Sequence, residues 1–455
     1  MLQSADSVAP SLAAYRALTA PTHGHGSEIP HSKSYSIDVP RPSRSPLNAV
    51  RKLAIAGATT TIAAHVAVAG TIVGIDAVRR RRSTEAHEFP HAAPLTTTVN
   101  ENLLTTYTYG VDLYEDMLAS IHAARSHVFF ESFIWKGDEY GQRFRDALAR
   151  AADRGVAVYV IYDAFGNFVV DNDFYADIDP RVHLLRFPLW RWGTGLSLRR
   201  SGRDHRKILV VDDAVAYAGG FNVGSLYATG WRDTHTRIQG PAVWELADAF
   251  VDFWNTYRHS RHPVLHDVGS RTWDASVRAH RNVPGQLLFP VRALYMDAIN
   301  RAQKRIYITQ GYFIPDTDIL HALLAARRRG VDVKVIIPER SNHILADWAA
   351  RGYYATLLEA GITLWLYSGA MIHAKTACID GQWTTIGSAN IDRLSLTGNY
   401  EINLAVVSES LAGQMESIFE MDLSNCRQLT EQEWDRRGLL PRLSERFISS
   451  LRPML

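Results

Sequence analysis

The sequence contains little cysteine, little lysine and almost no net charge. Its two cysteines, Cys378 and Cys426, form no CxxC pair and no spacing typical of a metal site. We therefore expect neither a disulfide framework nor a zinc site, and we predict that Cys378 is a small buried side chain. A formal net charge of +2 gives the 455-residue chain no strong field that would attract nucleic acid.

Lysine makes up 7 of the 49 basic residues, so arginine is the usual cation of this protein. Lys207 and Lys375 are exceptions, and they stand at equivalent places in two similar segments. An ammonium group is a compact charge, whereas a guanidinium is planar and wider. Lysine at both places favours a site that needs a compact cation.

A short pattern, HxKxxxxD followed after six residues by G[GS]xN, occurs twice. The first copy consists of His205, Lys207, Asp212, Gly219, Gly220 and Asn222. Every member has a counterpart 168 positions later, namely His373, Lys375, Asp380, Gly387, Ser388 and Asn390. A single match carries the false-positive risk of any short motif, but two copies with the same downstream G[GS]xN are far less likely to arise by chance. Imidazole, ammonium and carboxamide groups together suit the cleavage and formation of a phosphate ester.

Each copy is followed by an acidic residue at the same distance. Asp233 lies 28 positions after His205, and Glu401 lies 28 positions after His373. A carboxylate at constant offset is typical of a group that orients an imidazole and stabilises its protonated form. The simpler alternative for either acid alone is a solvated charge at a strand end.

The two copies resemble the phospholipase D superfamily. The segments DHRKILVVDDAVAYAGGFNVGSLY, WRDTHTRIQGPAVWELADAF, MIHAKTACIDGQWTTIGSANIDRLSLTGNYEINLAVV and EWDRRGLLPRLSERFISSLRPML are most similar to its bacterial cardiolipin synthase branch. The resemblance covers about residues 95–455. It implies two tandem phospholipase D-like α/β/α domains, at 95–275 and 280–455, related by a pseudo-two-fold. One histidine cannot be both nucleophile and acid, so the duplication also indicates one active site at the interface of the two domains.

The resemblance implies the following site, with no metal and no cofactor. The motif residues expected to form the catalytic set are His205, Lys207, Asp212, His373, Lys375 and Asp380. Within that set the resemblance makes His205 the nucleophile that forms a phosphohistidine and His373 the general acid and base, although the residues alone allow the reverse. The two motif aspartates fall near strand ends and are expected to be structural. The phosphate-binding residues are expected to be Asn222, Asn390, Lys207 and Lys375, and the orienting acids Asp233 and Glu401.

The first part of the chain differs from the rest. Residues 1–50 are rich in Ser, Pro and His without a sustained period, which predicts a disordered polar leader. Residues 53–75 carry one ionisable group in an apolar run long enough to cross a bilayer. Together with its basic flanks, 51–82 predicts a single membrane-anchor helix; a buried alanine-rich helix is the alternative. The arginines at 79–82 favour a cytoplasmic C-terminal region, although the basic residues before the run nearly balance them.

The body of the chain alternates between helical and strand patterns. Helices are expected at 112–125, 141–154, 291–303 and 317–329, and strands at 127–135, 156–166, 305–314 and 331–338. Each motif is expected to form a strand followed by a second strand that ends at its asparagine. Gly155 and Gly330 stand where helix gives way to strand and are expected to stop the helices. This alternation predicts an α/β fold with helical layers on both faces of a sheet.

The loop before the first motif interleaves aromatic and basic residues. Its members are Arg186, Phe187, Leu189, Trp190, Arg191, Trp192, Arg199, Arg200, Arg203 and Arg206. Such a mixture suits the headgroup region of an anionic bilayer, but it also suits packing on the protein's own surface or single-stranded nucleic acid. A final helix at 440–452 is expected to pack on the protein or to lie at an interface.

These features point to lipid rather than nucleic acid, with anionic phospholipid (phosphatidylglycerol) and a membrane surface as the expected partners. The resemblance favours a phosphatidyltransferase that joins two phosphatidylglycerols into cardiolipin and releases glycerol, located at the cell membrane. Three alternatives remain open. They are a phospholipase D with water as acceptor, a phosphodiesterase or nuclease of the superfamily, and a membrane scaffold without activity.

Overall fold

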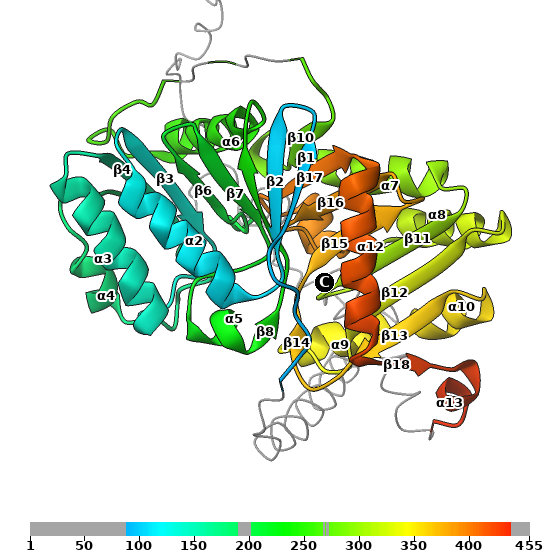
Figure 1. Ribbon diagram of the computed structural model, residues 1–455. Helices are drawn as coiled ribbons and strands as arrows, with labels where there is room; N and C mark the ends of the chain where they lie inside the picture. Colours follow the sequence, from blue (N-terminus) through cyan, green and yellow to red (C-terminus); the bar gives the residue numbers. More distant parts are fainter. Residues whose placement is uncertain (1–87, 190–201, 267–268, 270–272, 438–455) are drawn as a thin grey trace, which may run out of the picture. The chain divides into compact units, whose positions relative to one another are not determined.

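The computed structural model describes residues 88–189, 202–266, 269 and 273–437, all within one compact unit, Ile62–Leu455. They form an α/β fold with two eight-stranded sheets, which confirms the α/β class that the alternating patterns predicted (Figure 1). The predicted leader, membrane anchor and final helix lie outside the described residues. Within the described ranges, no helix is both long and apolar enough to span a bilayer.

The first sheet is formed by strands from the first half of the described chain, in the spatial order β1-β2-β9-β7-β6-β3-β4-β5. Their bounds are β1 Leu95–Val99, β2 Asn102–Tyr107, β3 His127–Ser132, β4 Ala157–Asp163, β5 His183–Phe187, β6 Ile208–Val211, β7 Val215–Gly219 and β9 His235–Gln239. Strands β3, β4 and β5 run parallel, whereas β6, β7 and β9 pair antiparallel with their neighbours.

The second sheet has the order β10-β17-β16-β15-β11-β12-β13-β18. Its strands are β10 Val277–Arg281, β11 Arg305–Gln310, β12 Asp332–Pro338, β13 Thr363–Tyr367, β15 Lys375–Ile379, β16 Trp383–Gly387, β17 Ile402–Val407 and β18 Cys426–Leu429. In spatial order, the seven strands from β2 to β5 of the first sheet match the seven strands from β10 to β13 of the second. Neighbouring strands in both runs have the same pattern of parallel and antiparallel pairing. The sheets differ in their outermost strand, which is β1 in one and β18 in the other.

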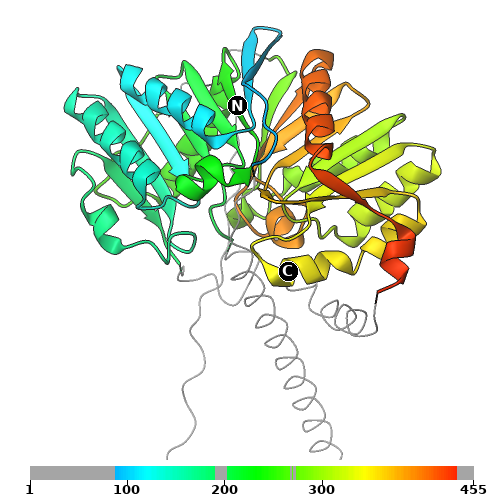
Figure 2. The same cartoon turned by 60° about the horizontal axis from the view of Figure 1, so that its bottom comes forward.

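Helices cover both faces of each sheet (Figure 2). In the first half they are α2 Gly110–Ala123, α3 Glu139–Asp153, α4 Asn172–Ala176, α5 Ser225–Thr229 and α6 Val243–Tyr257. In the second half they are η2 Pro284–Gln286, α7 Pro290–Arg301, α8 Thr317–Arg328, α9 Ile344–Arg351, α10 Tyr354–Glu359, α11 Arg393–Thr397, α12 Glu409–Leu423 and α13 Glu431–Asp435. Gly155 and Gly330 follow α3 and α8 with φ of 86° and 90°, as expected of glycines that end helices.

The cores follow from strand alternation. Along β3, Val128 and Phe130 pack with α2 and α3, whereas Phe129 on the opposite face stacks on Phe250 of α6 with ring centroids 4.7 Å apart. The second sheet repeats this arrangement, with α7 and α8 on one face and α12 on the other. One continuous core contains residues of both α6 and α12, so the two halves share apolar packing. Cys378 belongs to this core and is buried, as predicted.

Candidate active site

The two motifs lie where antiparallel strands begin. Lys375 is the first residue of β15, and Lys207 directly precedes β6, so the histidines stand just before their strands rather than within them. All four side chains are buried. In each copy the lysine Nζ donates to the backbone carbonyl of the histidine two positions earlier. Each lysine side chain therefore turns back onto its own His–Lys segment.

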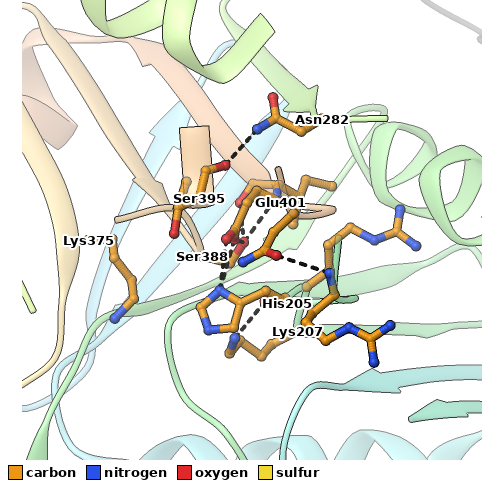
Figure 3. A network of polar contacts seen from close by, with 12 residues as sticks. His205, Lys207, Asn282, Lys375, Ser388, Ser395 and Glu401 are labelled. Carbon is orange, nitrogen blue, oxygen red and sulfur yellow. Dashed lines mark hydrogen bonds and ion pairs between the residues drawn. The ribbon is translucent and has the colours of Figure 1, made fainter. Parts of the chain in front are cut away.

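The imidazoles contact carboxylates from the opposite half. His205 Nδ1 lies 3.0 Å from both carboxylate oxygens of Glu401, and His373 Nδ1 lies 2.7 Å from Asp233 Oδ2. Figure 3 shows His205 facing Glu401, with Lys375 extending toward the same place from the second half. Because both Nδ1 atoms face carboxylates, Nε2 is the nitrogen of each ring left for chemistry. Each imidazole therefore contacts the acid that follows the other motif copy. The equal offset in the sequence does not reveal these crossed pairs.

Backbone contacts between the halves are also reciprocal. Asp204 forms a parallel bridge with Tyr400, and Ile372 pairs in parallel with Arg232, where β14 (Met371–Ile372) meets β8 (Trp231–Arg232). The two contacts are equivalent, because Ile372 lies 168 positions after Asp204 and Arg232 lies 168 positions before Tyr400. His205 N donates to Tyr400 O at 3.0 Å, and His373 N donates to Arg232 O at 2.7 Å. The chain segments that carry the histidines are thus fixed by the other half, and the two motifs meet in one site.

Each motif asparagine lies three residues beyond the second strand of its motif, which is β7 for Asn222 and β16 for Asn390. Asn222 Oδ1 accepts a hydrogen bond from Ile134 N at 3.1 Å, which leaves its amide NH₂ group to donate. Asn390 is buried, and its Oδ1 has no hydrogen-bond partner among the described residues. Both carboxamides therefore retain capacity for a further polar group.

Burial dominates the electrostatics of the site. It lowers the pKa of Lys207 to about 7 and that of Lys375 to about 8. It also lowers the pKa of His373 to about 3, and together with both lysines it holds the pKa of His205 well below its usual range. An anion bound beside these groups would raise all four pKa values, because it favours the protonated forms.

The two carboxylates titrate differently. Burial raises the pKa of Glu401 to about 8, although Lys207 opposes this. Burial would also raise the pKa of Asp233, but Lys375 and His373 outweigh it, so the net shift is downward. Asp233 is therefore the charged partner near neutral pH, and Glu401 is largely protonated.

The motif aspartates stay outside the site. Asp212 accepts hydrogen bonds of 2.8–2.9 Å from the backbone amides of residues 125–127, and Asp380 does the same for residues 303–305. Both have positive φ, 55° and 56°, in the turns that join β6 to β7 and β15 to β16. They fix turns at the far ends of the motif strands, as expected of structural residues, and they do not join the catalytic set.

Several contacts around the site were not predicted. The Ser388 hydroxyl donates to Glu401 Oε2 at 2.5 Å, and Asn282 N donates to the Glu401 carbonyl at 2.9 Å. The Asn282 side chain in turn donates to Ser395 O at 2.9 Å (Figure 3). Aromatic rings flank the imidazoles. The ring centroids of Phe133 and His205 are 4.7 Å apart, and those of Trp231 and His373 are 4.9 Å apart. Only Ser388 belonged to the motif, so the pattern alone could not indicate the others.

The interpretation of the loop before the first motif was wrong for two residues. Phe187 and Arg206 are buried, not at a surface. Arg206 Nη2 lies 2.5 Å from Glu131 Oε1, and its guanidinium packs over the Phe253 ring. Arg186 and Leu189 are exposed and Arg203 is half-buried, whereas the remaining members, Trp190, Arg191, Trp192, Arg199 and Arg200, lie outside the described residues.

No group of three or more His, Cys, Asp or Glu side chains in the described ranges is placed to hold a metal ion. The site instead offers two imidazoles with free Nε2 atoms, two buried amines and two carboxamides. These groups can bind a phosphate monoanion, attack it and transfer a proton.

Comparisons with known proteins agree with this chemistry. The sequence model described as "Cardiolipin synthase, PLD-like domain" matches residues 117–254 and 295–423. The chain is 33% identical over 369 residues to the major cardiolipin synthase ClsA of Bacillus subtilis (strain 168), covering 78% of this chain and 76% of that protein. It is 30% identical to a cardiolipin synthase of Clostridium perfringens (strain SM101 / Type A), covering 78% and 79%.

A solved structure shares the fold. Phosphatidylserine synthase of Haemophilus influenzae Rd KW20 aligns with a TM-score of 0.59 and 16% identity, over 79% of this chain and 95% of that chain. At that identity the likeness concerns the fold alone. The match of the family model spans more than half of the sequence, and both motif copies lie inside the matched ranges. The chain therefore belongs to the cardiolipin synthase family of PLD-like domain proteins.

Proposed function

We propose that this protein is a phosphatidyltransferase that makes cardiolipin from two phosphatidylglycerols and releases glycerol. The observation that carries the proposal is the pair of crossed His–carboxylate contacts, which places two imidazoles from two halves in one site with two buried lysines. The named activity of the two relatives supports the choice of substrate. We also propose that 95–275 and 280–455 act as tandem domains about a pseudo-two-fold.

In the first proposed step His205 Nε2 attacks phosphorus of phosphatidylglycerol. A P–N bond forms, the P–O bond to glycerol breaks, and His373 Nε2 gives its proton to the departing alkoxide. Lys207, Lys375 and the two motif asparagines hold the non-bridging oxygens, where charge develops. His205 suits the nucleophile, because its low pKa keeps it neutral, and Glu401 holds its Nδ1.

In the second proposed step His373 acts as a base instead of an acid. His373 Nε2 takes the proton from the hydroxyl group of a second phosphatidylglycerol, whose oxygen attacks phosphorus as the P–N bond breaks. His373 must be protonated for the first step, although burial lowers its pKa. Asp233 raises that pKa, and a bound phosphodiester anion raises it further. The charged state of Asp233 is thus part of the mechanism.

Product analysis tests the proposal. The full-length protein, reconstituted in phosphatidylglycerol vesicles, should yield cardiolipin and glycerol in equal amounts by mass spectrometry, and the His205→Ala variant should yield neither. Phosphatidic acid and glycerol without cardiolipin would instead identify a hydrolase with water as acceptor. Cleavage of DNA without any lipid product would overturn the choice of substrate.

We further propose that 51–82 anchors the chain in the cell membrane and that the catalytic domains are cytoplasmic. The apolar run at 53–75 and the arginines at 79–82 support this. Alkaline carbonate extraction of membranes should leave the full-length chain in the pellet and release a variant that lacks residues 1–82. Release of the full-length chain would contradict the anchor.

A further inference from the structure

Exposed apolar side chains gather beside one wall of the active site. The loop between β4 and α4 carries Phe165, Phe168 and Val169, whose side chains are 59%, 77% and 78% exposed. Exposed apolar groups on neighbouring positions are unusual for a soluble surface and mark a site of contact. In Figure 1, α4, which follows this loop, lies along the same lower edge as α5 and α9.

Buried Asn167 fastens this loop to the active site. Its Oδ1 accepts from Trp135 N at 2.7 Å, and its Nδ2 donates to Phe133 O at 2.8 Å. The Phe133 ring is the one that flanks His205, and Ile134 between them donates to Asn222. The apolar loop is therefore the outer surface of the segment that forms the His205 side of the site.

The same surface continues onto α5. Lys136 follows Trp135 and packs its side chain against Gly224, the N-cap of α5. Leu226 on α5 is 56% exposed, and its counterpart 168 positions later, Leu394 on α11, is 49% exposed. Lys136 has no ion-pair partner among the residues that the structure describes, so its charge is available to an anion. We define the apolar rim as Phe165, Phe168, Val169 and Leu226, with Lys136 as its cation.

We propose that the apolar rim docks onto an anionic phospholipid bilayer and holds the mouth of the active site at the lipid headgroups. This inference rests on the proposed function, since it assumes that the substrate is a bilayer lipid. Apolar side chains mixed with an unpaired cation are what an anionic membrane interface accepts, because the rings enter the acyl boundary while the ammonium meets headgroup phosphates. The counterpart loop of the second half, after β12, is polar, with Arg340, Asn342 and His343 exposed. The first half therefore makes the apolar contact.

A matched pair of charge substitutions tests the rim. Phe168→Glu alters its most prominent ring, whereas Val407→Glu alters a side chain that is 60% exposed at the end of β17 remote from Glu401. On vesicles containing phosphatidylglycerol, Phe168→Glu should lower turnover by about tenfold or more, the loss expected from one unburied phenyl group. Val407→Glu should change it by less than about twofold. On soluble short-chain phosphatidylglycerol both variants should match the unmodified protein. Equal activity of both variants on vesicles would overturn the docking surface.

A fluorescence experiment separates this proposal from the proposed function. A nitrobenzoxadiazole label is placed on Phe168→Cys or Val407→Cys of the full-length chain, with Cys426 changed to serine. Addition of anionic vesicles should shift the emission at position 168 to the blue and expose it to lipid-phase quenchers, with no change at position 407. Insertion without any lipid product would overturn the proposed function alone. A label at 168 that is already protected before vesicles are added would show that a second copy or another segment covers the rim, and would overturn the docking.

Discussion

The two halves of the site carry the same His–Lys pair in different surroundings. Asp204 and Arg206 flank the first pair and form a buried ionic cluster with Glu131, whereas Ile372 and Ala374 flank the second pair. Burial and Glu131 raise the pKa of Asp204 well above its usual range, although Arg206 opposes this. The chemistry shared by both halves therefore does not need charged neighbours, and the cluster is a structural feature of one half.

The acids that meet the imidazoles differ as well. Gly220 leaves room for the short Asp233, since a Cβ at 220 would lie 2.0 Å from Asp233 Oδ1. The second half has Ser388 at this place, and its hydroxyl holds the longer Glu401. Each half thus uses a matched pair, Gly with Asp or Ser with Glu. The charged Asp233 serves His373 and the protonated Glu401 serves His205, which is the asymmetry expected of an acid/base and a nucleophile.

The largest expected effect comes from the histidines themselves. His205→Ala and His373→Ala should each lower turnover by about 10⁴-fold or more, because either change removes a complete chemical step. Circular dichroism should show that both variants remain folded. With a labelled lipid whose leaving group needs no proton, such as a p-nitrophenyl phosphatidyl ester, rapid quenching should find a phosphatidyl-enzyme in His373→Gln but none in His205→Gln. The opposite labelling would exchange the two roles, and labelling of neither with full activity would refute the two-histidine mechanism.

The carboxylates should have unequal effects. Asp233→Asn removes a charge and should lower turnover by about 10²–10⁴-fold, as in other imidazole–carboxylate pairs. Glu401→Gln replaces a largely protonated group with a neutral amide and should cost about tenfold or less. Asp233 raises the pKa of His373, so its loss should move the alkaline limb of the pH–rate profile to lower pH, because His373 then loses its proton earlier. Equal losses in the two variants would show that both acids act in the same charge state.

The sequence predicted the elements and the motif members, since strand and helix periods and the repeat register are local properties. It did not predict the crossed pairs. Glu401 follows its own motif by 28 positions, but the contact with His205 depends on how two sheets meet, which no local pattern records. Arg206 was misinterpreted for the same reason, because its partner Glu131 is 75 positions away on β3. An arginine beside a basic, aromatic loop looks like a surface residue until its distant carboxylate is known.

Exchanging Gly220 and Ser388, the residues that neighbour the two acids, should have a smaller effect on turnover. The effect should be larger for the Gly220 variant than for the Ser388 variant. Gly220→Ser forces the Asp233 carboxylate aside and should lower turnover by about 10²-fold, through lost contact with His373. Ser388→Gly removes one hydroxyl hydrogen bond and should cost about tenfold or less. The proton resonances of His373 should shift in the first variant and stay unchanged in the second. A fully active Gly220→Ser would mean that Asp233 tolerates displacement and that the pairing is not required.

The smallest effect on turnover is expected where the halves are most alike. Asp212→Ala and Asp380→Ala should each lower the free energy of unfolding by about 1–3 kcal/mol, because each leaves three amides without their acceptor. Burial opposes ionisation of both carboxyl groups, but the backbone hydrogen bonds outweigh it, so both pKa values lie below the usual range. Their contribution is therefore complete above the pKa of the unfolded chain, about 3.9, and is lost as the pH falls through the folded values. Thermal unfolding at pH 7 and at pH 3 should show the deficit of both variants shrinking at the lower pH, with turnover per folded molecule unchanged. A loss of turnover confined to one of them would break the equivalence of the two turns and give that aspartate a part in the site.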